Sequence, residues 1–126
     1  MPKKPRSTDH SFAAIKEEVT RKATDLIEKV LKPKFVQPPP EGVQLNNIVD
    51  ITLRWLGQKC FFIAIYKTPD ATTFEEKFAR LQYVGQARFN LAFMRPTGQW
   101  VDMPYQNQTL DECMKAIVED PWFQLS

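Results

Sequence analysis

The fold is decided by residues 49–66, which read VDITLRWLGQKCFFIAIY. In the first half of this stretch apolar and polar residues alternate, which predicts a strand with one buried and one polar face. The apolar set is Val49, Ile51, Leu53 and Trp55, and the polar set is Asp50, Thr52 and Arg54. A tight turn around Gly57 follows, and the run Cys60 to Tyr66 is then apolar on both faces. Such a run predicts a central strand that is covered on both sides.

The rest of the sheet is predicted from shorter runs that are separated by turn-forming residues. Residues 67–76 are mostly polar and predict a loop. Three further strands are expected after it, over residues 78–84, 89–94 and 99–103. Because the connections between them are short, successive strands should pair as neighbours. We therefore expect an antiparallel meander of about five strands within residues 44–104.

A long helix is predicted before the sheet, over residues 11–32. Its apolar residues recur at spacings of three and four, which places them on one stripe. This stripe consists of Phe12, Ile15, Val19, Ala23, Leu26, Ile27, Val30 and Leu31. The helix should end at Lys32, because a residue that precedes a proline, here Pro33, avoids the α region.

A short helix is predicted after the sheet, over residues 109–120. Thr109 and Glu112 have the spacing of a capping box, in which each residue satisfies a free amide of the other. Pro121 stops this helix, and Trp122 and Phe123 are expected to fold back onto the core. The predicted fold class is α+β, with the meander sheet flanked by one long and one short helix.

Two segments outside these elements have distinctive compositions. Residues 1–10 are rich in Pro, Lys and Ser and predict a disordered basic tail. Residues 33–43 contain three consecutive prolines and predict a stiff, extended connector. Residues 11–126 should therefore form a single domain.

Composition and charge suggest a compartment and an asymmetry. Cys60 and Cys113 each lie in an apolar run, which predicts free, buried thiols in a reducing, cytoplasmic compartment. No apolar run is long enough to cross a bilayer, so no membrane association is expected. Residues 1–34 carry nine Lys and Arg against five Asp and Glu, whereas the remaining residues carry eight against ten. The basic character therefore belongs to the tail and the first helix.

The residues that catalysis most often uses are scarce. The one histidine, His10, lies in the tail. The sequence therefore excludes a Ser-His-Asp triad on a rigid scaffold and a metal site with several histidine ligands. The four glycines are scattered, so they form no phosphate-binding loop. We expect no cofactor and no metal, and we expect that the protein is not an enzyme.

Two surfaces are candidates for binding. In the hairpin around residues 96–98, Arg95, Gln99 and Trp100 could hold an anionic or planar ligand. The structural alternative is an ordinary hairpin in which Arg95 pairs with Asp102. The second candidate is a face of the sheet on which arginines and aromatic residues could stack bases, unless the first helix covers it. Its polar residues are Thr52, Arg54, Arg80, Gln82 and Asn90.

The C-terminal part of the chain resembles a family of small bacterial proteins that is catalogued as a domain of unknown function. The resemblance covers residues 35–126. It is carried by the stretches Pro38-Pro39-Pro40, Ala79-Arg80-Leu81-Gln82-Tyr83-Val84 and Phe93-Met94-Arg95, by Trp100, and by the closing helix with Trp122-Phe123. The turn Pro96-Thr97-Gly98 and the long charged first helix depart from that pattern. The resemblance implies the same fold and a bacterial source, and it implies no activity.

These observations lead to two functional expectations. The first is a non-enzymatic protein-binding or assembly module that meets a partner, or a second copy, through the first helix. The reason is that a small sheet is not expected to cover the whole apolar stripe of so long a helix. The alternative is a nucleic-acid-binding protein that uses the basic tail and the sheet face with Arg54 and Arg80.

Overall fold

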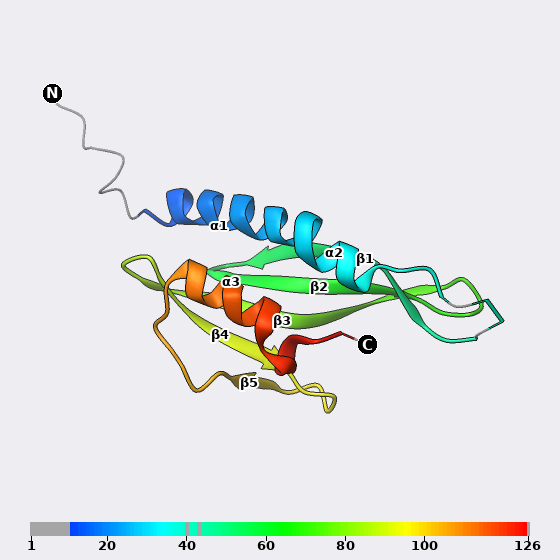
Figure 1. The fold of residues 1–126 in the computed structure, drawn as a ribbon. Helices are drawn as coiled ribbons and strands as arrows, with labels where there is room; N and C mark the ends of the chain where they lie inside the picture. The colour runs from blue at the N-terminus through cyan, green and yellow to red at the C-terminus, as the bar shows by residue number, and fades with distance from the viewer. Residues whose placement is uncertain (1–10, 40, 43, 126) are drawn as a thin grey trace, which may run out of the picture.

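The computed structural model describes residues 11–39, 41–42 and 44–125, so the predicted tail lies outside the described residues. Its helices and strands follow one another as expected for an α+β protein (Figure 1). They are α1 (Phe12–Leu26), the π-helical segment η2 (Ile27–Leu31), α2 (Lys32–Phe35), β1 (Asn47–Leu56), β2 (Lys59–Lys67), β3 (Thr73–Gly85), β4 (Arg88–Met94), β5 (Trp100–Asp102), α3 (Leu110–Glu119) and the 3-10 turn η3 (Pro121–Phe123). The strands form one antiparallel sheet in the order β1-β2-β3-β4-β5, which confirms the predicted meander.

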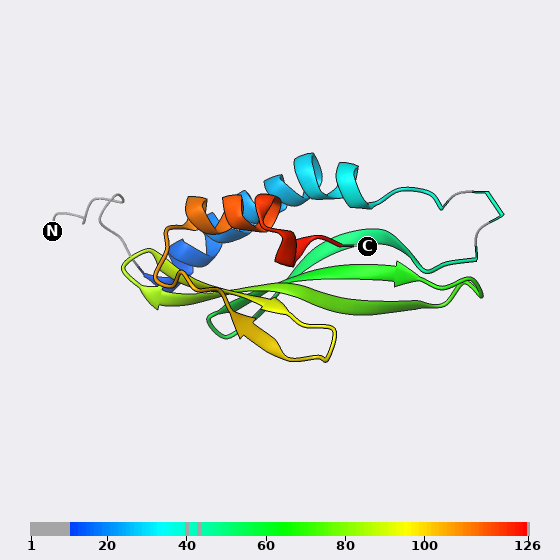
Figure 2. The same cartoon turned by 60° about the horizontal axis from the view of Figure 1, so that its bottom comes forward.

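The sheet has helices on one of its faces. Figure 2 shows α1 and α3 on the same side of the sheet. Residues that lie directly opposite each other on paired strands share a face. The row of Cys60, Leu81 and Leu91 belongs to the core beneath the helices. Successive side chains of a strand point to opposite faces, so the residues next to this row point away from the helices. We call the side to which they point the helix-free face. It comprises Thr52, Arg54, Phe61, Ile63, Lys77, Arg80, Gln82, Asn90, Ala92 and Asp102, together with Trp100.

The first helix continues through Pro33 to Phe35, so the predicted end at Lys32 is wrong. In a regular α-helix the ring of Pro33 would clash with the carbonyl group four residues earlier. The wider π-helical turn η2 comes just before it, and the amide of Lys32 bonds to the carbonyl of Ile27, five residues back. Such a bulge can accommodate a proline inside a helix. The connector therefore begins at Val36, after the helix.

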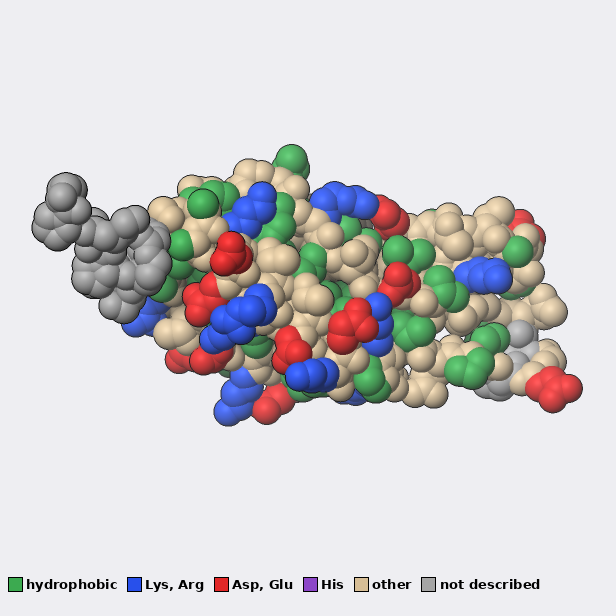
Figure 3. All heavy atoms as spheres, turned by 90° about the horizontal axis from the view of Figure 1, so that it is seen from above, with side chains coloured by type: hydrophobic (Ala, Val, Ile, Leu, Met, Phe, Trp, Pro, Cys, Tyr) green, Lys and Arg blue, Asp and Glu red, His purple; other side chains and the backbone are tan. Residues whose placement is uncertain are grey.

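The apolar stripe of the first helix is packed on its own sheet. Its central residues are between 0% and 5% exposed, and they belong to the same core as β2. They are Ile15, Val19, Ala23, Ile27 and Leu31. The sheet therefore covers most of the stripe but not all of it, since Val30 is 36% exposed and Phe12 and Leu26 are only half-buried. The surface seen in Figure 3 carries interspersed basic and acidic side chains. On the first helix, Lys29 forms an ion pair with Asp25, and both side chains are exposed.

Two strands differ from their predicted limits. β1 contains a bulge between Ile48 and Asp50, which leaves Val49 exposed and places Ile48 in the core. Val49 therefore does not share the buried face of Ile51. β3 begins at Thr73, so part of the segment expected to be a loop is a strand. The charged residues of this segment favour a loop by composition, but they lie on a strand whose outer edge is open.

The C-terminal segment closes the core as predicted, with one exception. Both hydrogen bonds of the capping box between Thr109 and Glu112 are present. Phe123, the last residue of η3, is buried, whereas Trp122 is 63% exposed and is therefore not a plug in the core. Among the described residues, no helix is long and apolar enough to cross a membrane.

The stability of the fold should depend strongly on Phe62, which is 0% exposed at the centre of β2. We expect Phe62→Ala to lower the free energy of unfolding by about 3–5 kcal/mol, because it leaves a cavity under the helices. Urea unfolding followed by circular dichroism measures this change. Leu45→Ala, at an exposed position before β1, should change it by less than about 0.5 kcal/mol. Equal effects of the two changes would contradict this description of the core.

Candidate functional site

Three of the five predicted site residues meet on the helix-free face. Arg54 and Arg80 lie on either side of Phe61, because both are its direct cross-strand partners. The ring of Trp100 lies with its centre 5.7 Å from that of Phe61, at an interplanar angle of 43°. The guanidinium carbon of Arg80 is 5.1 Å from the centre of the Trp100 ring. This distance is within the range of a cation–π interaction.

Charged side chains cover the apolar centre of this face. The guanidinium of Arg54 donates two hydrogen bonds to Glu75, with N–O distances of 3.0 and 2.8 Å. In the strand register, Arg54 on β1 and Glu75 on β3 lie diagonally on either side of Ile63 on β2, which is fully buried. The ammonium group of Lys77 lies 5.0 Å from the ring centre of Phe61. The expected burial of β2 on both sides is therefore confirmed, but long charged stems and one tryptophan cover the second side.

The charges of this face are partly neutralised by their partners. The hydrogen bonds from Arg54 hold the pKa of Glu75 below its usual value, so this carboxylate stays ionised at neutral pH. Arg80 donates a hydrogen bond of 3.2 Å to Asp102, so the predicted pair of Arg95 with Asp102 is wrong. The Nε atom of Arg80 is buried and has no hydrogen-bond partner within the described part of the chain.

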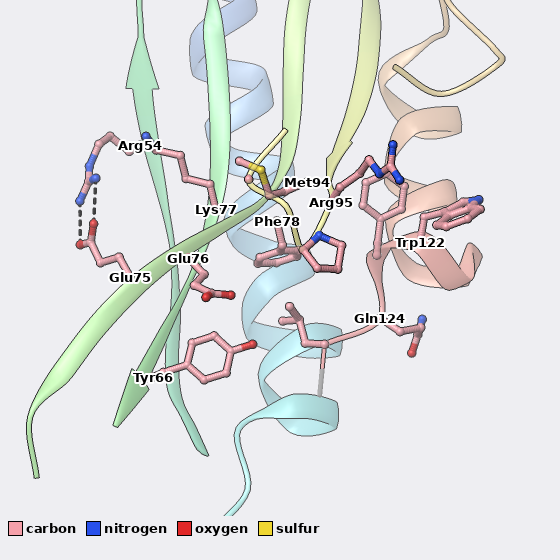
Figure 4. Close-up of a pocket in the computed structure, with 14 residues that line it drawn as sticks. Arg54, Tyr66, Glu75, Glu76, Lys77, Phe78, Met94, Arg95, Trp122 and Gln124 are labelled. Atoms are coloured by element: carbon pink, nitrogen blue, oxygen red, sulfur yellow. Dashed lines mark hydrogen bonds and ion pairs between the residues drawn. The ribbon is translucent and has the colours of Figure 1, made fainter. Parts of the chain in front are cut away.

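A cavity of about 620 Å³ lies next to this face, where β3 extends beyond β4. β4 pairs with β3 from Ala79 onward, so residues 73–78 of β3 pair with β2 alone. The cavity lies between this edge, the turn after β4 and the C-terminal segment (Figure 4). Its lining consists of Arg54, Tyr66, Glu75, Glu76, Lys77, Phe78, Met94, Arg95, Pro96, Gly98, Trp122, Phe123, Gln124 and Leu125.

The walls of the cavity combine apolar surface with a few charged groups. The ring of Trp122 stacks on Phe93 with a centre-to-centre distance of 4.8 Å, which holds an exposed aromatic group at the rim. Burial, with a smaller contribution from the carboxylate of Glu76, raises the pKa of the Tyr66 phenol. Tyr66 is therefore a neutral hydrogen-bonding group at neutral pH. The cavity therefore presents both apolar and charged surface to a ligand.

The structure divides the predicted site residues between two places. Arg80 and Trp100 lie on the helix-free face and Arg95 lines the cavity, whereas Arg54 belongs to both places. Gln99 has a role in the turn, since its backbone carbonyl accepts a hydrogen bond of 2.8 Å from the amide of Arg95. Trp122 and Glu76 also line the cavity, and sequence reasoning misses them, because it places Trp122 in the core and Glu76 in a loop.

The two cysteines are free and buried. Burial raises the pKa of each thiol to about 12, so both stay protonated at neutral pH. Within residues 11–39, 41–42 and 44–125, no three His, Cys, Asp or Glu side chains are grouped so that they could hold a metal ion.

The fold and the site define a two-layer α+β domain with an open sheet face and a cavity at a strand edge. The chain belongs to the family described as a domain of unknown function, DUF3024, whose model matches residues 11–124. The resemblance to an uncharacterised family is therefore confirmed, and the match includes the first helix, which lay outside the predicted range. No curated protein and no solved structure matches the chain.

The contact between Arg80 and Trp100 should contribute measurable stability. In a double-mutant cycle with Arg80→Met and Trp100→Leu, we expect a coupling energy of about 1 kcal/mol, as for a partly desolvated cation–π pair. Urea unfolding of the four proteins gives this value. A coupling near zero would contradict the idea that Arg80 holds the ring in place.

Proposed function

We propose that this protein is a non-enzymatic protein-binding module that takes up an extended segment of a partner beside β3. The observation that carries this proposal is the free edge of β3 at residues 73–78, next to an open cavity. A free strand edge offers backbone donors and acceptors to an added strand. Strand addition of this kind is a common mode of peptide recognition.

The walls of the cavity support an extended segment as the ligand. The turn with Arg95, Pro96 and Gly98 and the C-terminal segment with Trp122 both line the cavity. Figure 4 shows Arg95 and Trp122 across from Glu75 and Glu76. A strand that pairs with β3 would pass along these walls, and its alternate side chains would point in opposite directions. Trp122 is the strongest candidate for an energetic centre, because exposed tryptophans are enriched among the residues that dominate binding.

A phage-displayed library of linear peptides, selected on the full-length protein, tests this proposal. We expect a selected peptide to protect the amides of residues 73–78 from hydrogen exchange. Trp122→Ala should weaken its binding by about thirtyfold or more, which corresponds to a loss of at least about 2 kcal/mol. Isothermal titration calorimetry measures this loss.

A matched control keeps this test specific. Tyr105 is also an exposed aromatic residue, but it does not line the cavity, so Tyr105→Ala should leave the affinity unchanged. Protection confined to other strands, or a selection that yields no binding peptide, would overturn the proposal.

A second candidate function is binding of single-stranded nucleic acid on the helix-free face, and the distribution of charge favours it. Between residues 47 and 102 there are seven Lys and Arg against five Asp and Glu. After residue 102 there is one against four, and these four lie on or next to α3, on the other side of the sheet. The acidic balance of the C-terminal part therefore does not apply to the face that carries Arg54 and Arg80.

Fluorescence anisotropy with oligo-dT and oligo-rU of about 15 nucleotides tests the second candidate. We expect salt-dependent binding that Arg54→Ala and Arg80→Ala each weaken, because each removes a contact to phosphate. Lys29→Ala, on the outer surface of the first helix, is the matched control and should have little effect. The absence of binding at low salt would exclude this candidate.

We also propose that the protein works in a reducing, cytoplasmic compartment of a bacterium. The two free, buried cysteines support the compartment. The bacterial source rests on the family resemblance alone.

A further inference from the structure

The outer edge of β1 is a second open strand edge, and it is separate from the cavity. β1 is the first strand of the sheet and pairs with β2 alone among the described strands. Two of its apolar side chains face solvent, since Leu56 is 69% exposed and Val49, at the bulge, is also exposed. A long strand edge with exposed apolar residues is a place where another chain can pair.

The sequence of this edge is complementary to itself. Residues 50–54 read Asp-Ile-Thr-Leu-Arg. If two copies pair antiparallel about a two-fold axis at Thr52, Asp50 of each copy lies opposite Arg54 of the other. Ile51 then lies opposite Leu53, and the two Thr52 residues face each other. Opposite charges and apolar pairs at directly opposed positions stabilise a strand pair.

We propose that a second copy of this chain pairs along the outer edge of β1 in this register, which joins the two sheets into one. Such a symmetric contact closes on itself and forms a dimer rather than a filament. The predicted homodimer would then form through the sheet and not through the first helix, most of whose apolar stripe is already buried.

The local structure of β1 supports this register. The strand is regular from Asp50 onward, because its bulge lies before this residue. The side chains of Asp50 and Arg54 are 48% and 50% exposed, so both can reach a partner. Asp50 already pairs with Lys32 of the first helix, and Arg54 pairs with Glu75 of β3 across β2, so Arg54 has to exchange Glu75 for Asp50 of the second copy. Leu53 packs only partly against the core, and a paired copy would cover it further.

The other open edge is less suited to a second copy. The segment of β3 at residues 73–78 reads Thr-Phe-Glu-Glu-Lys-Phe. Symmetric pairing centred on this segment, about Glu76, would place two Glu76 carboxylates directly opposite each other. Like charges at directly opposed positions destabilise a strand pair. Symmetric pairing at the β1 edge places no like charges opposite each other. We therefore assign the β1 edge to the second copy, and we assign the β3 edge to a different chain.

Charge reversal tests the register. In the dimer, Asp50→Lys would place an ammonium group opposite the Arg54 guanidinium of the other copy. Arg54→Glu would place a second carboxylate opposite Asp50, so each variant alone should lose the contact. An equimolar mixture of the two variants should pair again, because the introduced ammonium group then faces the introduced carboxylate, and the remaining Arg54 faces the remaining Asp50.

Sedimentation velocity over a wide concentration range measures the association. A contact made by one strand pair is small, so we expect wild-type dimerisation in the micromolar range. Each single variant should weaken it by about tenfold or more. Asp25→Lys reverses a charge on the first helix and is the matched control, which should leave the dimer unchanged.

A further variant shows whether the loss of the dimer comes from the proposed register or from the loss of an ion pair within each chain. Thr52→Lys places two ammonium groups at the two-fold axis and leaves both ion pairs intact, so it should also give a monomer. Circular dichroism confirms that each variant is folded. A wild-type protein that stays monomeric at all concentrations, a dimer that survives Thr52→Lys, or a mixture that does not pair again would overturn the proposal. The Trp122→Ala variant should dimerise normally, so a failure here is distinct from a failure of peptide binding at the cavity.

Discussion

The burial of both faces of β2 is the constraint on which the rest of the structure depends. Phe62 is fully buried on one face, and Phe61 and Ile63 are buried on the other. The helices supply the cover on the first side only, so the second side must be covered by side chains of the sheet itself. The pair of Arg54 with Glu75, the stem of Lys77 and the Trp100 ring supply that cover. An arginine on this face therefore has a packing role as well as a charge.

This dual role bears on any function of the helix-free face. A guanidinium group that already pairs with a carboxylate has to exchange that partner, or share its remaining donors, before it binds a phosphate. Arg80 retains a buried Nε without a hydrogen-bond partner among the described residues, while its charge is shared between Asp102 and Trp100. The face is thus pre-organised, and its capacity for an anionic ligand is limited by its own acidic residues.

The cavity has a different origin, which is the unequal length of neighbouring strands. β3 has 13 residues and β4 has seven, so part of β3 extends past its neighbour. The turn after β4 and the segment after α3 then line a cavity beside this unpaired edge (Figure 4). An open edge is a liability for aggregation, and proteins usually blunt it with charges. Here Glu75, Glu76 and Lys77 do so, and they also set the chemistry of the cavity.

Local patterns in the sequence determined most of the elements. The uninterrupted apolar run of β2, the alternation in β1 and the capping box of Thr109 with Glu112 act over a few residues, so each could be predicted from the chain. The sequence also suggests that Arg54 and Arg80 share a face, and the strand register decides that they do, because the predicted loop between their strands fixes no register. The end of the first helix, the bulge at Val49 and the start of β3 could not be predicted in this way. The helix end depends on the π-helical turn before Pro33, and the other two depend on pairing with β2.

Only the tertiary structure decided which side of the sheet the helices cover, and hence which residues form a surface. Both faces of β2 are apolar in sequence, so the pattern is the same whichever side the helices take. The choice is made by contacts between α1, α3 and strands far away in the chain. The cavity likewise requires residues from β3, the turn after β4 and the C-terminal segment, which come together only in the folded protein. The sequence by itself determined an α+β meander with a doubly buried strand, and tertiary packing determined what that sheet presents to a partner.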